Sequence, residues 1–157
     1  VSPGGAAEVF VVDPVPERRA LAGELGAAAT AATCEEVVGW TGGRGVDLVL
    51  EATDAGEAPA QAAEAVRIGG RLILAGIPSC DTMVLRAATL RRKGLTLKVV
   101  RRMKHTYPRA IRMVRSGHVR LLPLITHRFA LSGAAEAFSL HASRSDGVIR
   151  AVIEMPG

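Results

Sequence analysis

The first residue in the chain whose type and position suggest chemistry is an aspartate that closes an apolar segment. Residues 9–12 are Val-Phe-Val-Val, Asp13 follows them, and a helix is expected to begin near Pro16. In a doubly wound α/β sheet, an acidic residue at the end of the second strand hydrogen-bonds the adenosine ribose of NAD. Asp13 is therefore predicted to bind this ribose. The glycine-rich turn that should precede it by about 20 residues has no room before it, so we expect a cofactor-binding domain without its first unit.

The other residues that could do chemistry do not form recognisable sites. The turn at 41–45, Thr-Gly-Gly-Arg-Gly, precedes a strand, whereas a phosphate-binding loop must follow one. Cys34 and Cys80 have no second Cys or His at a metal-ligand spacing, and reduced thiols are expected for a cytosolic protein. The four histidines are dispersed and fit surface or capping positions. The sequence thus predicts no metal ligands and no catalytic residues in this chain.

The composition indicates one domain with a core of small aliphatic residues. Of 157 residues, 48% are hydrophobic and only 3% are aromatic, which fits helices packed closely on a parallel sheet. No stretch reaches the roughly 18 apolar residues of a membrane span, and no signal peptide pattern is seen, so we expect a cytoplasmic protein without a membrane partner. The net charge is +5, with basic clusters at 91–93 and 101–104. No aromatic residues interleave with these clusters for base stacking, which argues against nucleic acid.

Strands and helices alternate along the first half of the sequence. Strands are expected at 9–13, 46–53 and 71–77, and helices at 16–25, 34–40 and 57–67, with a short strand left open within 27–32. Thr33 and Glu36 have the form of a capping box for the second helix, and Gly69 with Gly70 is expected to close the third. This alternation implies right-handed crossovers and a parallel sheet. Farther on, the pattern predicts a strand at 95–100, a helix between Thr106 and Gly117, an extended segment at 121–129, a helix at 132–140 and a strand at 147–154, while 83–90 fits either a strand or a helix.

Several segments occur in an order and spacing that resemble a known family. They are 11–13 with Arg18 and 25–27, then 43–53 and 69–76, and most specifically 101–111 and 123–129. Together they resemble the C-terminal half of the medium-chain zinc-dependent alcohol dehydrogenases, and within that family the sorbitol, xylitol and related polyol dehydrogenases. The resemblance implies an α/β fold with a Rossmann-like, doubly wound parallel sheet. This sheet would be incomplete, because its first strand and glycine-rich turn are missing.

The resemblance also implies roles for individual residues. Asp13 would bind both ribose hydroxyls and repel a 2′-phosphate, which favours NAD over NADP, and Arg18 would lie near the same ribose. The other residues implied to contact the cofactor are Ala52, Thr53, Ala75, Gly76, Ile77, Val100 and Arg101. Gly76 would let the backbone approach the nicotinamide ribose closely, and Arg102 would face the substrate. Ordinary strand-end packing, or solvation of a surface arginine, is the alternative for each of these positions apart from Asp13.

In the family, the zinc ligands and the proton relay lie in an N-terminal domain, and the missing strand lies between strands 9–13 and 46–53. We therefore expect residues 1–146 to form a partial NAD-binding Rossmann domain. Residues 147–157 would form a terminal strand that pairs with the missing catalytic domain. NAD binding by the chain alone should be weak or absent, zinc should be bound only by the missing domain, and the free strand edges should promote aggregation.

The leading hypothesis is a coenzyme-binding fragment of an NAD-dependent, zinc-type polyol or secondary-alcohol dehydrogenase. The parent enzyme would transfer hydride from a small alcohol or polyol to NAD, and the fragment alone would be inactive. One alternative is a non-catalytic nucleotide-binding or regulatory module of the same fold. Another is an oligomerisation module, because residues 83–100 resemble the inter-subunit strand region of the family. A homo-oligomer formed through this region is expected in either case.

Overall fold

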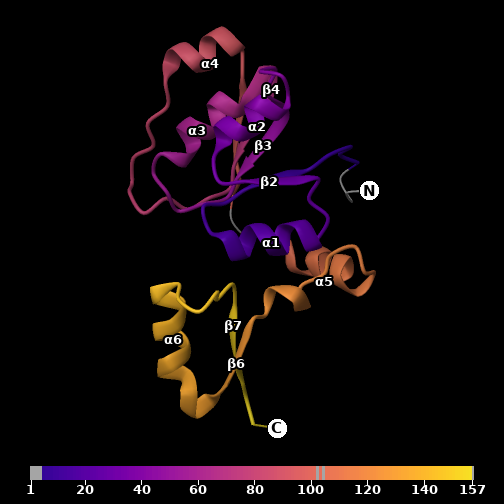
Figure 1. Cartoon of the computed structure of the whole chain (residues 1–157), viewed down its shortest axis with the longest axis vertical. Helices are drawn as coiled ribbons and strands as arrows, with labels where there is room; N and C mark the ends of the chain where they lie inside the picture. The colour runs from indigo at the N-terminus through magenta and orange to yellow at the C-terminus, as the bar shows by residue number, and fades with distance from the viewer. Residues whose placement is uncertain (1–4, 102, 104, 157) are drawn as a thin grey trace. The chain divides into compact units, whose positions relative to one another are not determined.

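The computed structural model describes residues 5–101, 103 and 105–156, so the predicted substrate-facing residue Arg102 lies outside the described residues. The chain divides into two compact units, one made of Val1–Thr30 with His105–Gly157 and the other of Ala31–Lys104. Each unit contains strands and helices of its own (Figure 1). None of the helices in the described residues is long and apolar enough to cross a membrane.

The second unit contains a three-stranded parallel sheet, as the alternating pattern predicts. Its strands lie in the order β3 (Val46–Glu51), β4 (Val66–Leu74) and β5 (Thr96–Val99). Its helices are α2 (Cys34–Trp40), α3 (Ala58–Ala65) and α4 (Ala87–Lys93). Helix α3 joins β3 to β4, and α4 joins β4 to β5, so each parallel pair is connected by a helical crossover. The ambiguous segment at 83–90 contains the start of α4 and no strand.

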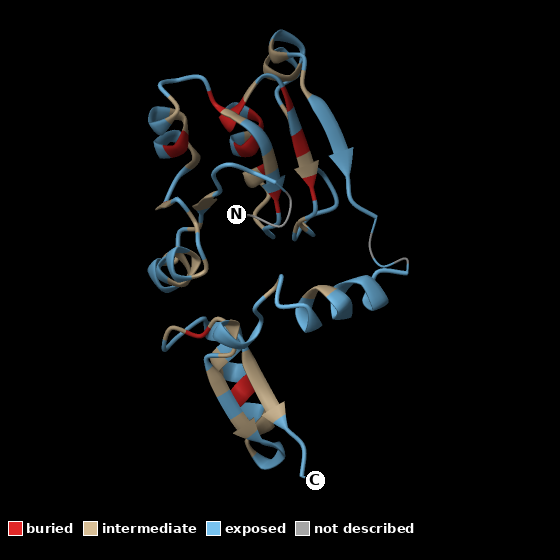
Figure 2. Cartoon of the chain, turned by 90° about the vertical axis from the view of Figure 1, so that its right-hand side faces the viewer, coloured by how far each residue is buried: buried red, intermediate tan, exposed pale blue. Residues whose placement is uncertain are grey.

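The core of this unit lies between α3 and the middle strand, β4. Ala62 and Ala63 on the helix pack with Val66, Leu72 and Leu74 on the strand, and none of these residues is more than 3% exposed. Small alanine side chains let the helix lie close to the sheet, which keeps the interior densely packed. Figure 2 shows buried positions on helices and on two of the three strands, whereas edge strand β5 is exposed along its length.

The junction between α3 and β4 differs from the sequence-based expectation. The helix was expected to reach residue 67 and to be closed by Gly69 and Gly70, but α3 ends at Ala65 and β4 begins at Val66 without a connecting loop. Gly70 lies inside β4, where a Cβ atom would collide with Cγ1 of Val66. The expected helix cap at Gly69 and Gly70 is therefore wrong, and Gly70 is required by packing within the strand.

One lysine supplies hydrogen bonds to the backbone at this junction. The Lys93 ammonium, at the end of α4, donates to the carbonyl oxygens of Ala63 (3.3 Å), Glu64 (2.6 Å) and Val66 (2.9 Å). The last carbonyls of an α-helix have no donor within the helix, and a positive charge is favourable at this end of the helix dipole. Lys93 therefore ties α4 to the end of α3.

A carboxylate pairs with two arginines where β3 begins. Arg44 donates from Nη1 and Nη2 to the two oxygens of Asp47 at 3.2 and 3.1 Å, and Arg67 donates to it from Nε. These hydrogen bonds lower the pKa of Asp47 to about 2. The interaction connects the turn before β3 to the start of β4, on the side of the sheet where the strands begin.

The first unit contains two separate two-stranded sheets. In one, β1 (Phe10–Val12) pairs with β2 (Ala29–Ala31), whose last residue begins the second unit; in the other, β6 (His127–Ala130) pairs in parallel with β7 (Ala151–Glu154). The helices are α1 (Pro16–Glu24), α5 (Tyr107–Arg115) and α6 (Ala134–Ser143), with short 3-10 helices η1 (Leu122–Leu124) and η2 (Leu131–Gly133). Helix α6 is the crossover between β6 and β7.

Three predictions for this unit are refined by the structure. The short strand left open at 27–32 forms as β2. The extended segment expected at 121–129 is partly wrong, because η1 forms a helical turn around Pro123 and only β6 is a strand. The strand expected at 147–154 is limited to β7, since residues 145–148 form a turn closed by a hydrogen bond from Val148 to Ser145.

Strands β1 and β3, which in the family would flank the missing strand, belong to different sheets. Among the described residues, β1 pairs only with β2, and β3 pairs only with β4. Strands β1 and β3 do not pair with each other in the described residues. One edge of β3 and one edge of β1 therefore have no hydrogen-bonded strand in the described part of the chain.

We predict that replacing Lys93 with methionine destabilises the protein. Methionine keeps much of the apolar stem but cannot donate to the three carbonyls, and leaving such groups unpaired should lower the free energy of unfolding by about 2 kcal/mol. Urea denaturation measures this change. Lys98→Met, the same substitution on exposed strand β5, should alter the free energy of unfolding by less than about 0.5 kcal/mol. Equal losses in the two variants would contradict the assignment.

Candidate functional site

Asp13 follows β1, and the chain after it holds its carboxylate in place. Oδ1 accepts a hydrogen bond from the N–H of Val15 at 2.9 Å, and Nη1 of Arg18 lies 3.6 Å from Oδ2. The Asp13 side chain remains 24% exposed. A carboxylate has about four acceptor positions, so Asp13 keeps acceptor capacity for hydroxyl groups while its orientation is fixed.

Two arginines of α1 hold the turn around Asp13. Arg18 contacts the carboxylate, and Nη1 of Arg19 donates to the Asp13 carbonyl oxygen at 2.7 Å. Arg18 was predicted to lie near the ribose bound by Asp13; its contact with the carboxylate is a finding, and its contact with a ribose stays a prediction. Arg19 was not identified from the sequence, because a contact across six residues has no recognisable local pattern.

The predicted residues that follow β3 surround a buried carboxylate. Glu51 is only 6% exposed, and its Oε1 accepts hydrogen bonds from the N–H (2.7 Å) and the hydroxyl (2.8 Å) of Thr53. The Thr53 hydroxyl oxygen in turn accepts a hydrogen bond from the N–H of Ala55 at 3.2 Å. These bonds fix the loop that leaves β3, with Ala52 and Thr53 exposed.

The segment that follows β4 packs directly on this loop. The N–H groups of Ala75 and Gly76 donate to the carbonyl oxygen of Glu51 at 2.8 and 3.1 Å. A Cβ atom at Gly76 would collide with the carbonyl oxygen of Thr53 and would lie 2.7 Å from both carboxylate oxygens of Glu51. Glycine is therefore required at this position by the packing of the chain itself, while close approach of a cofactor stays a prediction.

The remaining predicted residues lie at the ends of β4 and β5. Ile77 is 65% exposed. The N–H of Val100 donates to the carbonyl oxygen of Leu74 at 2.8 Å, which continues the pairing of β5 with β4, and Arg101 is exposed beyond it. The structure thus brings the residues predicted in the second unit to the carboxyl ends of its strands, where ligands bind in such folds. Asp13 and Arg18 belong to the first unit.

Glu51, like Arg19, was not identified as a site residue from the sequence. It is the only charged residue that is buried among those the structure describes. A usable signal was present, because an acidic residue ends the otherwise apolar run Leu48–Leu50, just before the strand-end residues. The apolar run predicts a buried strand, and the carboxylate at its end is the departure from that pattern.

Metal-ligating side chains do not cluster in the described residues. No group of three or more His, Cys, Asp or Glu side chains there could hold a metal ion. Both cysteines are free thiols. Burial, and secondarily the nearby Glu35 carboxylate, raise the pKa of the Cys34 thiol, while Sγ of Cys80 donates to the Thr82 carbonyl oxygen at 3.1 Å.

Two histidines hydrogen-bond to nearby hydroxyl groups, and one of them also contacts a carboxylate farther along the chain. Nδ1 of His118 lies 2.6 Å from the Ser116 hydroxyl oxygen. Nδ1 of His127 lies 2.9 Å from the Thr126 hydroxyl oxygen, and its Nε2 lies 3.3 Å from Asp146. These contacts fit the surface and capping positions that the sequence favours.

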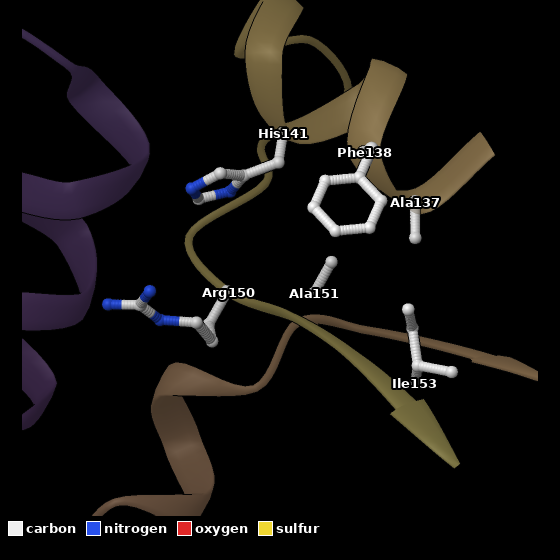
Figure 3. A pocket seen from close by; sticks show the side chains of 6 residues that line it. All are labelled: Ala137, Phe138, His141, Arg150, Ala151 and Ile153. Carbon is white, nitrogen blue, oxygen red and sulfur yellow. The ribbon is translucent and has the colours of Figure 1, made fainter. Parts of the chain in front are cut away.

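A small pocket lies between α6 and β7 in the first unit (Figure 3). Its volume is about 130 Å³, well below the roughly 300–1,000 Å³ of typical ligand sites. It is lined by Ala137, Phe138, His141, Arg150, Ala151 and Ile153. None of the predicted cofactor residues is among them, so this pocket is not part of the candidate site.

The sequence of this chain is similar to those of known dehydrogenases. The model of one family, described as zinc-binding dehydrogenase, matches residues 4–116. This chain belongs to the zinc-binding dehydrogenase family. L-arabinitol 4-dehydrogenase of Hypocrea jecorina is 31% identical to this chain over 123 residues, which cover 78% of the chain and 32% of the relative. L-threonine 3-dehydrogenase of Bacillus velezensis is 32% identical over 143 residues, or 87% of the chain and 41% of the relative.

Solved structures agree with this assignment. An alcohol dehydrogenase from Thermus sp. ATN1 matches with a TM-score of 0.85 and 25% identity, covering 97% of this chain and 46% of the other. An alcohol dehydrogenase from Thermotoga maritima matches with a TM-score of 0.83 and 29% identity, covering 97% and 44%. The predicted family and the α/β fold are thereby confirmed. The chain spans less than half the length of each of these relatives.

We predict that Gly76→Ala destabilises the protein much more than Gly39→Ala. The new methyl group at residue 76 meets the Thr53 carbonyl and the Glu51 carboxylate, and such overpacking costs about 1–3 kcal/mol. At Gly39, within α2, nothing lies within 4 Å of a Cβ atom, and alanine should stabilise the helix by up to about 1 kcal/mol. Urea denaturation of both variants tests this. Similar effects at both positions would refute the crowding at Gly76.

Proposed function

We propose that this chain is the coenzyme-binding part of an NAD-dependent, zinc-type polyol or secondary-alcohol dehydrogenase. The observation that carries the proposal is the surface formed by Thr53 and Gly76 at the carboxyl ends of β3 and β4, in a chain of the zinc-binding dehydrogenase family. The names of the relatives, L-arabinitol 4-dehydrogenase and L-threonine 3-dehydrogenase, support a small alcohol or polyol as the substrate.

Asp13 is proposed to hold the adenosine end of the cofactor. Its carboxylate retains acceptor capacity and is partly exposed, as hydrogen bonding to two ribose hydroxyls requires. A 2′-phosphate beside this carboxylate would be repelled, which favours NAD over NADP. Arg18 orients the carboxylate through its contact with Oδ2, and its guanidinium has further donors for the same ribose.

The strand-end residues of the second unit are proposed to hold the nicotinamide end. Ala52, Thr53, Ala75 and Gly76 present short side chains and backbone there, which lets a flat ring and its ribose lie close to the chain. Ile77 adds an exposed apolar side chain that could cover the ring and exclude water. Val100 and Arg101 are proposed to extend this surface past the end of β5.

In the proposed reaction, the cofactor and a zinc ion would supply the reacting groups. Bound NAD provides the hydride acceptor, and zinc in a separate catalytic domain would polarise the alcohol oxygen as a Lewis acid. We propose that the residues of this chain bind and orient the cofactor. By the family resemblance, Arg102 would face the substrate. The chain alone is expected to bind NAD weakly or not at all and to be inactive.

A second candidate function, subunit association, is favoured by the exposed strand β5. All four of its residues are exposed, with Val99 at 72%, and β4 is its only hydrogen-bonded neighbour among the described residues. A free strand edge is a template for pairing with another chain. We propose that this edge, together with the preceding residues from 83 onward, forms a contact between two copies of the protein.

We predict that Asp13→Asn weakens binding of NADH to the chain by about tenfold, because a charge-assisted hydrogen bond contributes roughly 1.5–3 kcal/mol. Ligand-observed NMR detects the millimolar affinities expected here. Glu24→Gln, which neutralises an exposed carboxylate at the end of α1, should leave the affinity unchanged. NADPH should bind more weakly than NADH. Binding that is insensitive to Asp13, or a preference for NADPH, would contradict the assigned role.

We predict that Val99→Pro reduces self-association without unfolding the chain. The Val100 N–H points to β4, so by the alternation along a strand the Val99 N–H points to the free edge. Proline removes that donor only, and edge strands tolerate it there. Sedimentation velocity should show a shift from dimer to monomer, whereas Val99→Thr, which keeps the N–H, should remain associated. A native chain that is monomeric at high concentration would refute the proposed contact.

A further inference from the structure

Glu51 carries a charge that its structural role does not require. Its role in the fold is to accept two hydrogen bonds from Thr53, and a neutral glutamine oxygen can accept both. None of the ion pairs among the described residues involves Glu51. The hydrogen bonds that Glu51 accepts therefore come from neutral donors, and no cation in the described part of the chain pairs with it.

Burial strengthens the electrostatic effect of the Glu51 carboxylate on groups near it. A charged group removed from water is costly unless it is paired, and its field is screened much less than that of an exposed group. Glu51 is 6% exposed, and both its carboxylate oxygens lie 2.7 Å from the position of a Cβ atom at Gly76. Because Gly76 has no side chain, it adds little shielding between this charge and the strand-end surface.

Resting on the proposed function, we propose that Glu51 determines which redox state of the cofactor this surface prefers. The oxidised nicotinamide ring carries a positive charge, and the reduced ring is neutral. A buried carboxylate behind Gly76 and Thr53 attracts the oxidised ring and gives no such attraction to the reduced one. The charge thus favours binding of NAD⁺ and release of NADH, which suits a parent enzyme that oxidises alcohols.

The test compares Glu51→Gln with Thr53→Val. Glutamine removes the charge but can still accept from Thr53, whereas valine keeps the charge and removes the hydroxyl donor. We expect Glu51→Gln to lower the ratio of NAD⁺ affinity to NADH affinity by roughly tenfold, the effect of one unit charge at moderate distance. Thr53→Val should change both affinities by the same factor. Equal weakening of both nucleotides in Glu51→Gln would show that the residue only holds the loop, and would overturn the proposal.

A second measurement uses probes that do not need a phosphate-binding turn. The cation 1-methylnicotinamide and neutral nicotinamide are titrated separately into the isotope-labelled chain, and the amide signals of Thr53 and Gly76 are followed by NMR. The cation should perturb these signals at about tenfold lower concentration than the neutral ring, and Glu51→Gln should abolish the difference. Equal responses to both probes in the native chain would overturn the redox preference. Absence of any response to probes and nucleotides would overturn the proposed cofactor site as well, so the two failures are distinguishable.

Discussion

The second unit depends on how helix α3 ends. The helix passes into β4 without a loop, so no following turn can supply donors to its last carbonyls. The Lys93 ammonium supplies them from the end of α4. This interaction fixes the helix that covers the core, the strand that lies at the centre of the sheet and the crossover that leads to β5. The alanines of α3 can then remain close to Leu72, which is fully buried.

At the carboxyl ends of β3 and β4, the residues that pack the two strand ends together are also those proposed to bind nicotinamide. The backbone oxygen of Glu51 accepts from two amides of the next strand end, and its carboxylate orders Thr53. Gly76 has to be a glycine for this arrangement to close. The surface proposed for nicotinamide is therefore rigid before any ligand arrives, which reduces the entropy lost on binding.

Features with a local cause were predictable from the sequence. The capping box formed by Thr33 and Glu36 was recognised from two residues three positions apart and is present in the structure. The contacts of Lys93 with α3 and of Glu51 with Gly76 were not recognised, because they depend on how segments some 25 residues apart come together. Gly70 is the reverse case. Its local sequence predicts a helix cap, but in the structure it lies inside β4, where packing against Val66 leaves no room for a side chain.

The arrangement of the two units along the chain has a consequence for the order of folding. The second unit is one continuous segment, Ala31–Lys104, whereas the first is assembled from segments on both sides of it. During synthesis, β3, β4 and β5 with their crossovers can pack as soon as they have emerged. The first unit has to wait for residues beyond His105, and forming it joins the two ends of a long intervening segment. If that segment is already folded, its compact shape replaces a flexible loop and much of the entropic cost of closure is removed.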